Sequence, residues 1–159
     1  MLGFSELIIR LGAAALIGCA IGLDREIKGK PTGVRTLGLV ALGSALAVMS
    51  STDFVATATS HDGSTSRAIQ GVITGIGFLG GGVILKDSSS GHVQGLTTAA
   101  AIWVTACMGF VCGLGAWKAV WISAGLIFAL LIVGGRIDEL VHHRWQAREE
   151  DRPDQDRPL

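Results

Sequence analysis

The stretch "GVITGIGFLGGGVI", residues 71–84, decides between a soluble nucleotide-binding protein and a membrane protein. Its central part, "GIGFLG" at residues 75–80, matches the G-x-G-x-x-G pattern of dinucleotide-binding loops. That pattern requires a preceding strand, a helix that begins at the glycines and an acidic residue about 20 positions later. Here an uncharged segment, residues 68–85, runs straight through the motif, and position 100 is an alanine within another apolar segment. The sequence therefore argues against a dinucleotide site.

Composition and charge distribution instead predict a polytopic membrane protein. The chain has 159 residues, of which 49% are hydrophobic and 16% charged, and its mean hydropathy is +0.51. The charged residues gather in clusters, and the segments between them are long enough to cross a bilayer, which takes about 17–25 apolar residues. A soluble helical core is the alternative, but so small a domain cannot cover this many apolar helices. We predict an all-α transmembrane helix bundle of about five helices. The expected spans are residues 7–23, 36–51, 68–85, 96–114 and 116–133.

The basic residues predict the orientation of the chain in the membrane, because lysine and arginine concentrate in cytoplasmic loops. Five spans place one set of basic residues on one side: Arg25, Lys28, Lys30, Arg35, Lys86, Arg136, Arg144, Arg148, Arg152 and Arg157. The other side receives only Arg67 and Lys118. We therefore expect an outside N-terminus and a cytoplasmic C-terminus. Residues 1–135 form the predicted transmembrane domain, and residues 136–159 a cytoplasmic tail with a short amphipathic surface helix followed by disorder.

The glycines are predicted to form helix-packing seams. In lipid, small residues let two helix backbones approach closely, and they therefore line helix interfaces. The residues assigned to such seams are Gly18, Gly22, Gly71, Gly75, Gly77, Gly81, Gly109 and Gly113. The alternative is that Gly80–Gly82 breaks the third span and builds an ion or substrate site at mid-depth. Seams can act within one chain or between chains, and we expect a homodimer.

The densest polar stretch is "DREIKGKPTGVRT", residues 24–36, at the expected cytoplasmic mouth. Asp24 and Glu26 can hold a hard cation such as Mg²⁺, which takes one or two carboxylates and keeps several waters. The basic side chains of the stretch can instead contact anionic lipid or phosphate: Arg25, Lys28, Lys30 and Arg35. An ordinary positive-inside loop with internal ion pairs is the third interpretation.

Other polar residues are expected near the ends of the spans. Thr36 opens the second span, Thr97 is predicted to cap the fourth, and Thr98 to hydrogen-bond a neighbouring helix. Glu6 and Arg10 have the favoured i,i+4 spacing. With Arg67 they form an expected outer cluster. No Ser/His/Asp or Cys/His grouping suggests a nucleophilic enzyme, so we expect no enzymatic activity, no cofactor other than Mg²⁺ and no nucleic-acid partner.

Four stretches taken together resemble the MgtC/SapB family of bacterial inner-membrane proteins: "IGLDREIKGKPTGVRT", "LVALGSALAV", "SRAIQGVITGIGFLGGGVIL" and "GLTTAAAIWVTACMGFVCGLG". The resemblance implies a bundle of about five membrane helices with an outside N-terminus. It also implies a link to growth under magnesium limitation and, in pathogens, to survival inside macrophages. Some members are thought to restrain the membrane ATP synthase, which makes that enzyme an expected partner. The signature polar positions carried over are Asp24, Arg25, Glu26, Lys30, Arg35, Thr36, Arg67, Thr97 and Thr98.

Two departures from the family pattern affect the expected function. Members studied as virulence factors carry a cytoplasmic C-terminal regulatory domain, which we expect residues 136–159 to lack. Residues 63–65 also replace the Asp-Pro that often precedes Ser-Arg.

The first hypothesis for the function is a non-enzymatic membrane modulator that docks against another membrane protein. The alternative is an ion or small-solute carrier that uses Asp24, Arg25 and Glu26, while an enzyme acting on lipid headgroups is disfavoured.

Overall fold

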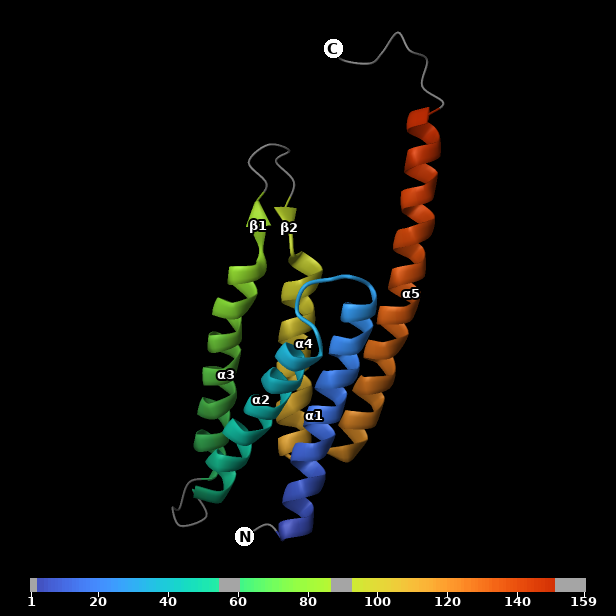
Figure 1. The fold of residues 1–159 in the computed structure, drawn as a ribbon. Helices are drawn as coiled ribbons and strands as arrows, with labels where there is room; N and C mark the ends of the chain where they lie inside the picture. Colours follow the sequence, from blue (N-terminus) through green and yellow to red (C-terminus); the bar gives the residue numbers. More distant parts are fainter. Residues whose placement is uncertain (1–2, 55–60, 87–92, 151–159) are drawn as a thin grey trace. The chain divides into compact units, whose positions relative to one another are not determined.

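The computed structural model describes residues 3–54, 61–86 and 93–150, and the fold is all-α (Figure 1). The helices within these ranges are α1 (Phe4–Ile27), α2 (Val34–Phe54), α3 (His61–Val83), α4 (Leu96–Gly113) and α5 (Trp117–Glu150). A short antiparallel ribbon pairs β1 (Leu85–Lys86) with β2 (Val93–Gln94) at the adjoining ends of α3 and α4. The chain divides into two compact units, Met1–Ala124 and Gly125–Leu159. The prediction of an all-α helix bundle is confirmed.

Four of these helices are long and apolar enough to cross a membrane: α1, residues 34–51 of α2, α4, and residues 117–136 of α5. Many of their large hydrophobic side chains are exposed, as Leu16 and Leu130 illustrate. Apolar side chains on the outside of long helices are what a lipid environment requires, and the chain is a multi-pass membrane protein. The helix α3 is not among the four, because Arg67, Gln70 and its glycines lower its mean hydropathy. The third span therefore stays a prediction.

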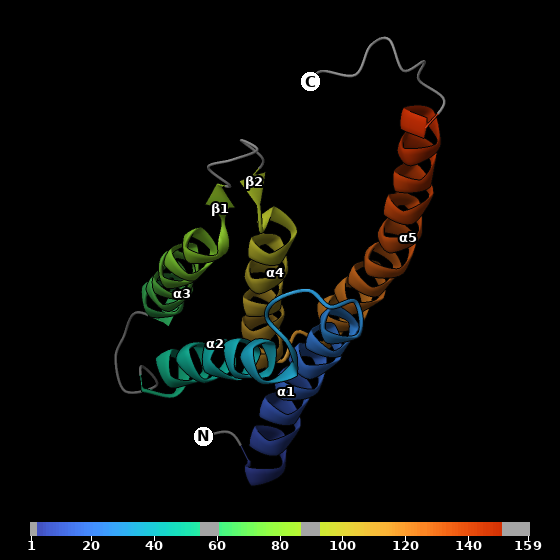
Figure 2. The same cartoon turned by 45° about the horizontal axis from the view of Figure 1, so that its top comes forward.

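The first unit is organised around α2, which contacts α1, α3 and α4. In Figure 2, α2 crosses α4 and runs from α1 toward α3. Glycine is needed where α1 meets α2: a Cβ on Gly18 would lie 2.6 Å from the carbonyl oxygen of Leu37, and one on Gly22 would lie 2.7 Å from the Cα of Val34. The two backbones touch directly, as expected of small-residue packing in lipid.

The contact between α2 and α4 also depends on glycines that allow the two backbones to touch. A Cβ on Gly109 would overlap the carbonyl oxygen of Ala41, and a Cβ on Gly113 would lie 2.8 Å from the carbonyl oxygen of Ala45. Both alanines are fully buried. Small residues on both helices bring the backbones together, so positions 109 and 113 have no room for a larger side chain.

The glycine run of α3 behaves differently from these seams. The helix is continuous from His61 to Val83, so residues 80–82 do not break it, and the mid-depth broken-helix site is absent from α3. A Cβ added to Gly71, Gly75, Gly77 or Gly81 would meet nothing within 4 Å. These four glycines therefore pack against no other part of the described chain. A role between chains stays a prediction.

The last helix also differs from expectation. A short surface helix was predicted to begin after residues 134–135, but α5 continues through both glycines to Glu150. Two glycines within a long helix lower its stability without ending it, because each costs only about 1 kcal/mol relative to alanine. The predicted disorder at residues 151–159 lies outside the described residues.

Candidate functional site at the turn between α1 and α2

The charged stretch of residues 24–36 is folded around a tight turn at the end of α1. The N–H of Gly29 donates to the carbonyl of Glu26 at 3.1 Å, and that of Lys30 donates to the carbonyl of Arg25 at 2.9 Å. Gly29 has a positive φ of 62°. This is the Schellman arrangement, in which glycine adopts the left-handed conformation after the helix end. The chain reverses here and enters α2 at Val34.

Arg25 is the central side chain of this turn, with only 1% of its surface exposed. Its Nη2 donates to Thr98 Oγ1 on α4 at 2.5 Å and to the carbonyl of Pro31 at 3.0 Å. Its Nε donates to the carbonyl of Pro31 and to Thr32 Oγ1, both at 3.3 Å. All of these acceptors are neutral oxygens. A buried charge must be hydrogen-bonded, and through these hydrogen bonds the guanidinium joins α1, the turn and α4.

Thr32 is held in an unusual conformation by these contacts. Its φ is +66°, which makes it the one non-glycine residue with positive φ among the described residues. A β-branched residue rarely adopts this region, and such strain persists only when the surroundings impose it. The Thr32 hydroxyl donates to the Pro31 carbonyl at 2.5 Å while accepting from Arg25. Thr32 was not among the residues predicted from the sequence, where its only signal is its place between Pro31 and Gly33.

The two carboxylates predicted to hold Mg²⁺ contact different protein groups. Asp24 pairs with Lys28, with Oδ1 and Nζ 2.8 Å apart. Glu26 Oε2 accepts the N–H of Val34, the first residue of α2, at 3.1 Å. A carboxylate at a helix N-terminus satisfies an otherwise unpaired donor and complements the helix dipole. Among the described residues no group of three His, Cys, Asp or Glu side chains is placed to hold a metal. The magnesium site stays a prediction.

Two cavities adjoin the turn. The larger, about 780 Å³, is lined by Leu23, Glu26, Gly29, Lys30, Gly33, Val34, Arg35 and Thr36. The smaller, about 280 Å³, is lined by Lys30, Pro31, Val83, Gln94, Gly95, Thr97 and Thr98. Lys30 borders both cavities. The structure thus collects the predicted residues of the cytoplasmic mouth around one end of the first unit.

The start of α4 corrects one prediction. Thr97 was expected to cap this helix, but α4 begins at Leu96, and its N-cap is Gly95 without a side-chain cap hydrogen bond. Gly95 has φ of +90°, and a Cβ there would overlap the carbonyl oxygen of Val83 at the end of α3. Close contact with α3 therefore requires glycine at the cap position. Thr97 lies exposed within the first turn of α4. Thr98 does bind a neighbouring helix, through Arg25.

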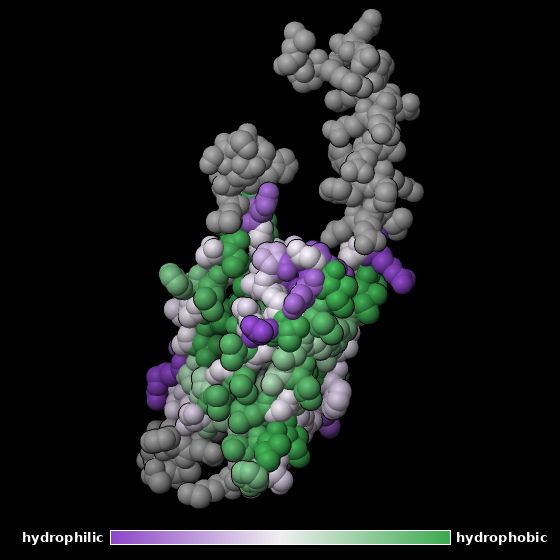
Figure 3. Space-filling model, in the orientation of Figure 1, coloured by the Kyte–Doolittle hydropathy of each residue, from purple (hydrophilic) through white to green (hydrophobic). Residues whose placement is uncertain are grey.

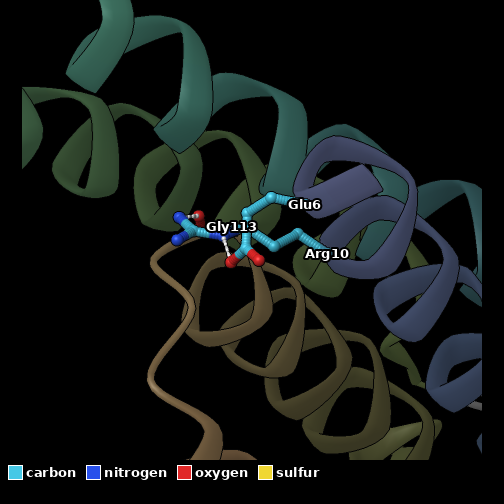
Figure 4. A network of polar contacts seen from close by, with 3 residues as sticks. All are labelled: Glu6, Arg10 and Gly113. Atoms are coloured by element: carbon cyan, nitrogen blue, oxygen red, sulfur yellow. Dashed lines mark hydrogen bonds and ion pairs between the residues drawn. The ribbon is translucent and has the colours of Figure 1, made fainter. Parts of the chain in front are cut away.

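The expected outer cluster lies at the other end of α1. Figure 4 shows that Arg10 donates from Nε to Glu6 at 2.8 Å and from Nη1 to the carbonyl of Gly113 at 2.9 Å. That carbonyl belongs to the C-terminal end of α4, which carries partial negative charge. The third predicted member, Arg67, is folded over Gly63 on α3, with Nη1 2.9 Å from the position of a Cβ there. The structure therefore brings Glu6 and Arg10 together and adds α4 as their partner.

One polar residue of the core escaped prediction. Thr105 on α4 is fully buried, and its hydroxyl has no hydrogen-bond partner among the described residues. A buried hydroxyl without a partner costs free energy. Its only sequence signal is a threonine within an apolar segment, which is also the pattern of a satisfied hydroxyl.

Comparisons with known proteins agree on one family. A model described as "MgtC family" matches residues 11–140. Protein SrpB of Synechococcus elongatus is 45% identical over 141 residues, which cover 81% of this chain and 74% of SrpB. "Putative magnesium transporter YhiD" of Escherichia coli is 44% identical over 132 residues, or 81% of this chain and 60% of that protein. Protein MgtC of Salmonella typhimurium is 41% identical over 108 residues, or 68% of this chain and 43% of MgtC.

The chain spans only part of the length of these relatives. The chain spans less than two thirds of YhiD and less than half of MgtC. No solved structure matches the chain. The family resemblance carried by the four sequence stretches is confirmed by the matches.

Proposed function

Because this chain belongs to the MgtC family, we propose that it is a non-enzymatic membrane protein that docks against another membrane protein and supports adaptation to magnesium limitation. The magnesium in the name of the relative YhiD and the link to magnesium limitation that the family resemblance implies motivate the physiological part of the proposal. The docking part rests on the surface of α3.

The observation that carries the docking part is the open glycine face of α3. Gly71 and Gly75 are exposed, and nothing in the described chain lies within 4 Å of a Cβ at either position. At Gly18 on α1 and Gly109 on α4, by contrast, the backbone of α2 occupies the space that a Cβ would need. Since lipid supplies no hydrophobic drive for helix association, small residues matter mainly where another helix approaches. The face of α3 suits such a helix, from a second copy of the chain or from a different protein such as the ATP synthase that the family resemblance implies.

The packing of the core favours a modulator over a channel or carrier. The helix α2 touches α1 at Gly18 and α4 at Gly109 with backbone-to-backbone contact. At those two positions there is no space for a side chain between the helices, and the two cavities described above lie at the α1–α2 turn, at one end of the first unit. A protein whose three central helices are locked in this way is suited to present a fixed outer surface.

A carrier of ions or small solutes is the alternative, and the name of the relative YhiD favours it. Asp24, Arg25 and Glu26 would then form the cytoplasmic entrance. Flux of Mg²⁺ into proteoliposomes tests this function. Unchanged flux through an Asp24→Asn, Glu26→Gln double variant would contradict the assignment of the entrance. Absence of flux through the wild-type protein would contradict the carrier function itself.

We also propose an outside N-terminus in a bacterial inner membrane. Arg25, Lys30 and Arg35 gather at the α1–α2 turn, and the positive-inside rule assigns such a turn to the cytoplasm. Topology reporters fused after the C-terminus and into the α1–α2 turn test this, and activity of a periplasmic reporter at either place contradicts it.

The test of docking is a pair of matched substitutions. Gly75→Leu on α3 and Gly43→Leu on α2 both add a side chain where a Cβ meets nothing within 4 Å. We expect Gly75→Leu to fold normally, to lose partners that co-purify in mild detergent, and to fail to support growth in low magnesium. Gly43→Leu should behave as wild type. Equal behaviour of the two variants contradicts the proposal.

A further inference from the structure

We propose that the 780 Å³ cavity at the α1–α2 turn binds the headgroup of an anionic phospholipid, with Lys30 and Arg35 holding its phosphate. Neither the family match nor the proposed docking function assigns a ligand to this cavity. Its volume lies within the range of small-molecule sites in proteins, about 300–1,000 Å³.

The charges of the cavity call for an anion. Lys30 and Arg35 both line it, and neither side chain makes a hydrogen bond or ion pair with any described residue. Glu26 also lines it, but Glu26 Oε2 accepts the N–H of Val34 and so faces the start of α2. The guanidinium of Arg35 matches the geometry of a phosphate, and Lys30 adds a second positive charge. Two cations against one engaged carboxylate leave the site net positive.

The apolar border of the cavity identifies the source of the phosphate. Leu23 lines it and remains 52% exposed. Leu39 lies one helical turn beyond Arg35 on α2 and is 68% exposed. Both belong to segments that are long and apolar enough to cross a membrane. Figure 3 shows a hydrophilic patch over the α1–α2 turn bordered by hydrophobic residues of the helices. A lipid uses both surfaces, because its phosphate meets the cations while its acyl chain follows the leucines.

The position of the cations along the helices agrees with this ligand. Arg35 is the second residue of α2, and Lys30 lies within the turn, so both are at the ends of membrane-spanning segments. Basic residues at this depth attract anionic lipid headgroups, and their contribution falls off within about 10 Å of the surface.

Thermal unfolding of the full-length protein in mild detergent tests the proposal. Phosphatidylglycerol and phosphatidylcholine with identical acyl chains are added separately, and lipid retention is followed by native mass spectrometry. We expect phosphatidylglycerol to raise the Tm more than phosphatidylcholine. The Lys30→Gln, Arg35→Gln variant should lose this difference and bind phosphatidylglycerol about 30-fold more weakly, at roughly fivefold per basic residue. Lys118→Gln, a matched change of an exposed lysine on α5, should retain it.

Three results would overturn the proposal. The first is a wild-type protein that responds equally to both lipids, a readout that needs no variant. The second is a preference for phosphatidylglycerol that the Lys30→Gln, Arg35→Gln variant retains to the same degree as the charge-preserving Lys30→Arg, Arg35→Lys variant. The third is an equal Tm increase with inorganic phosphate alone, which would identify a soluble anion as the ligand.

Discussion

The guanidinium of Arg25 donates a hydrogen bond to the hydroxyl of Thr98, 73 residues later in the chain. This contact joins the end of α1 to the first turn of α4, and it is completed by the Pro31 carbonyl in the intervening turn. The charged stretch of residues 24–36, which was predicted to be a loop, is therefore anchored in the core by Arg25, its one buried basic side chain.

Replacing the acceptor of this contact should destabilise the protein. Thr98→Val keeps the shape of the side chain but removes an oxygen that accepts from a buried guanidinium, and hydrogen bonds to charged groups contribute about 1.5–3 kcal/mol. We expect a loss of that size in the free energy of unfolding in detergent. Thr97→Val, the same change at the exposed neighbour, should alter it by less than about 0.5 kcal/mol. Equal losses would mean that the hydrogen bond contributes nothing specific.

The glycines of α4 and α3 should respond oppositely to alanine. A Cβ at Gly109 would overlap Ala41, so Gly109→Ala must force α2 and α4 apart, at a cost of about 1–3 kcal/mol or more. Gly75→Ala meets open space and should stabilise α3 by up to about 1 kcal/mol through helix propensity. Unfolding curves of the two variants measured side by side decide this. A tolerated Gly109→Ala would contradict the packing of α2 against α4.

Glu26 should matter more for stability than Asp24. Glu26→Ala removes the acceptor at the first N–H of α2, and loss of a capping group costs about 0.5–2 kcal/mol. Asp24→Ala removes an i,i+4 pair with Lys28, and such pairs contribute about 0.3–0.5 kcal/mol. The measurement is thermal unfolding at low ionic strength. The reverse order, or a stabilising effect of Mg²⁺ that both variants lose, would indicate a shared metal site instead.

Thr105→Val should raise the stability of the protein or leave it unchanged. The hydroxyl is buried without a partner, and an unsatisfied polar group costs about 1–3 kcal/mol. Valine has nearly the same shape and carries no polar group. Ser44, a buried hydroxyl on α2 that donates to the Val40 carbonyl, provides the control, and Ser44→Ala should show no such gain. A marked loss on Thr105→Val would show that the hydroxyl has a function within the core.

The helices could be predicted from sequence because lipid imposes long apolar segments between charge clusters. The same pattern could not identify which glycines meet a helix of the same chain. Gly18 and Gly75 each have a second glycine four residues away, yet α2 covers the first and nothing in the described chain covers the second. That difference is set by the positions of other helices, which local spacing does not encode.

The polar site was predicted in its membership but only partly in its contacts. Arg25 and Thr98 were both named, but their hydrogen bond depends on the turn at Gly29 and on the placement of α4. Thr32 was missed because a left-handed threonine has no compositional signature. The end of α1 was not predicted either, although Gly29 there adopts the left-handed conformation that is usual for glycine after a helix.

Photo-crosslinking in living cells tests the central claim most directly. A photoreactive side chain is placed at position 75 on α3 or, as the control, at position 43 on α2, and both positions are open in this chain. If α3 is a docking surface, position 75 should yield a discrete crosslinked protein, identifiable by mass spectrometry, and position 43 should yield only lipid adducts. Lipid adducts alone at position 75, in cells grown with and without magnesium, would contradict the account.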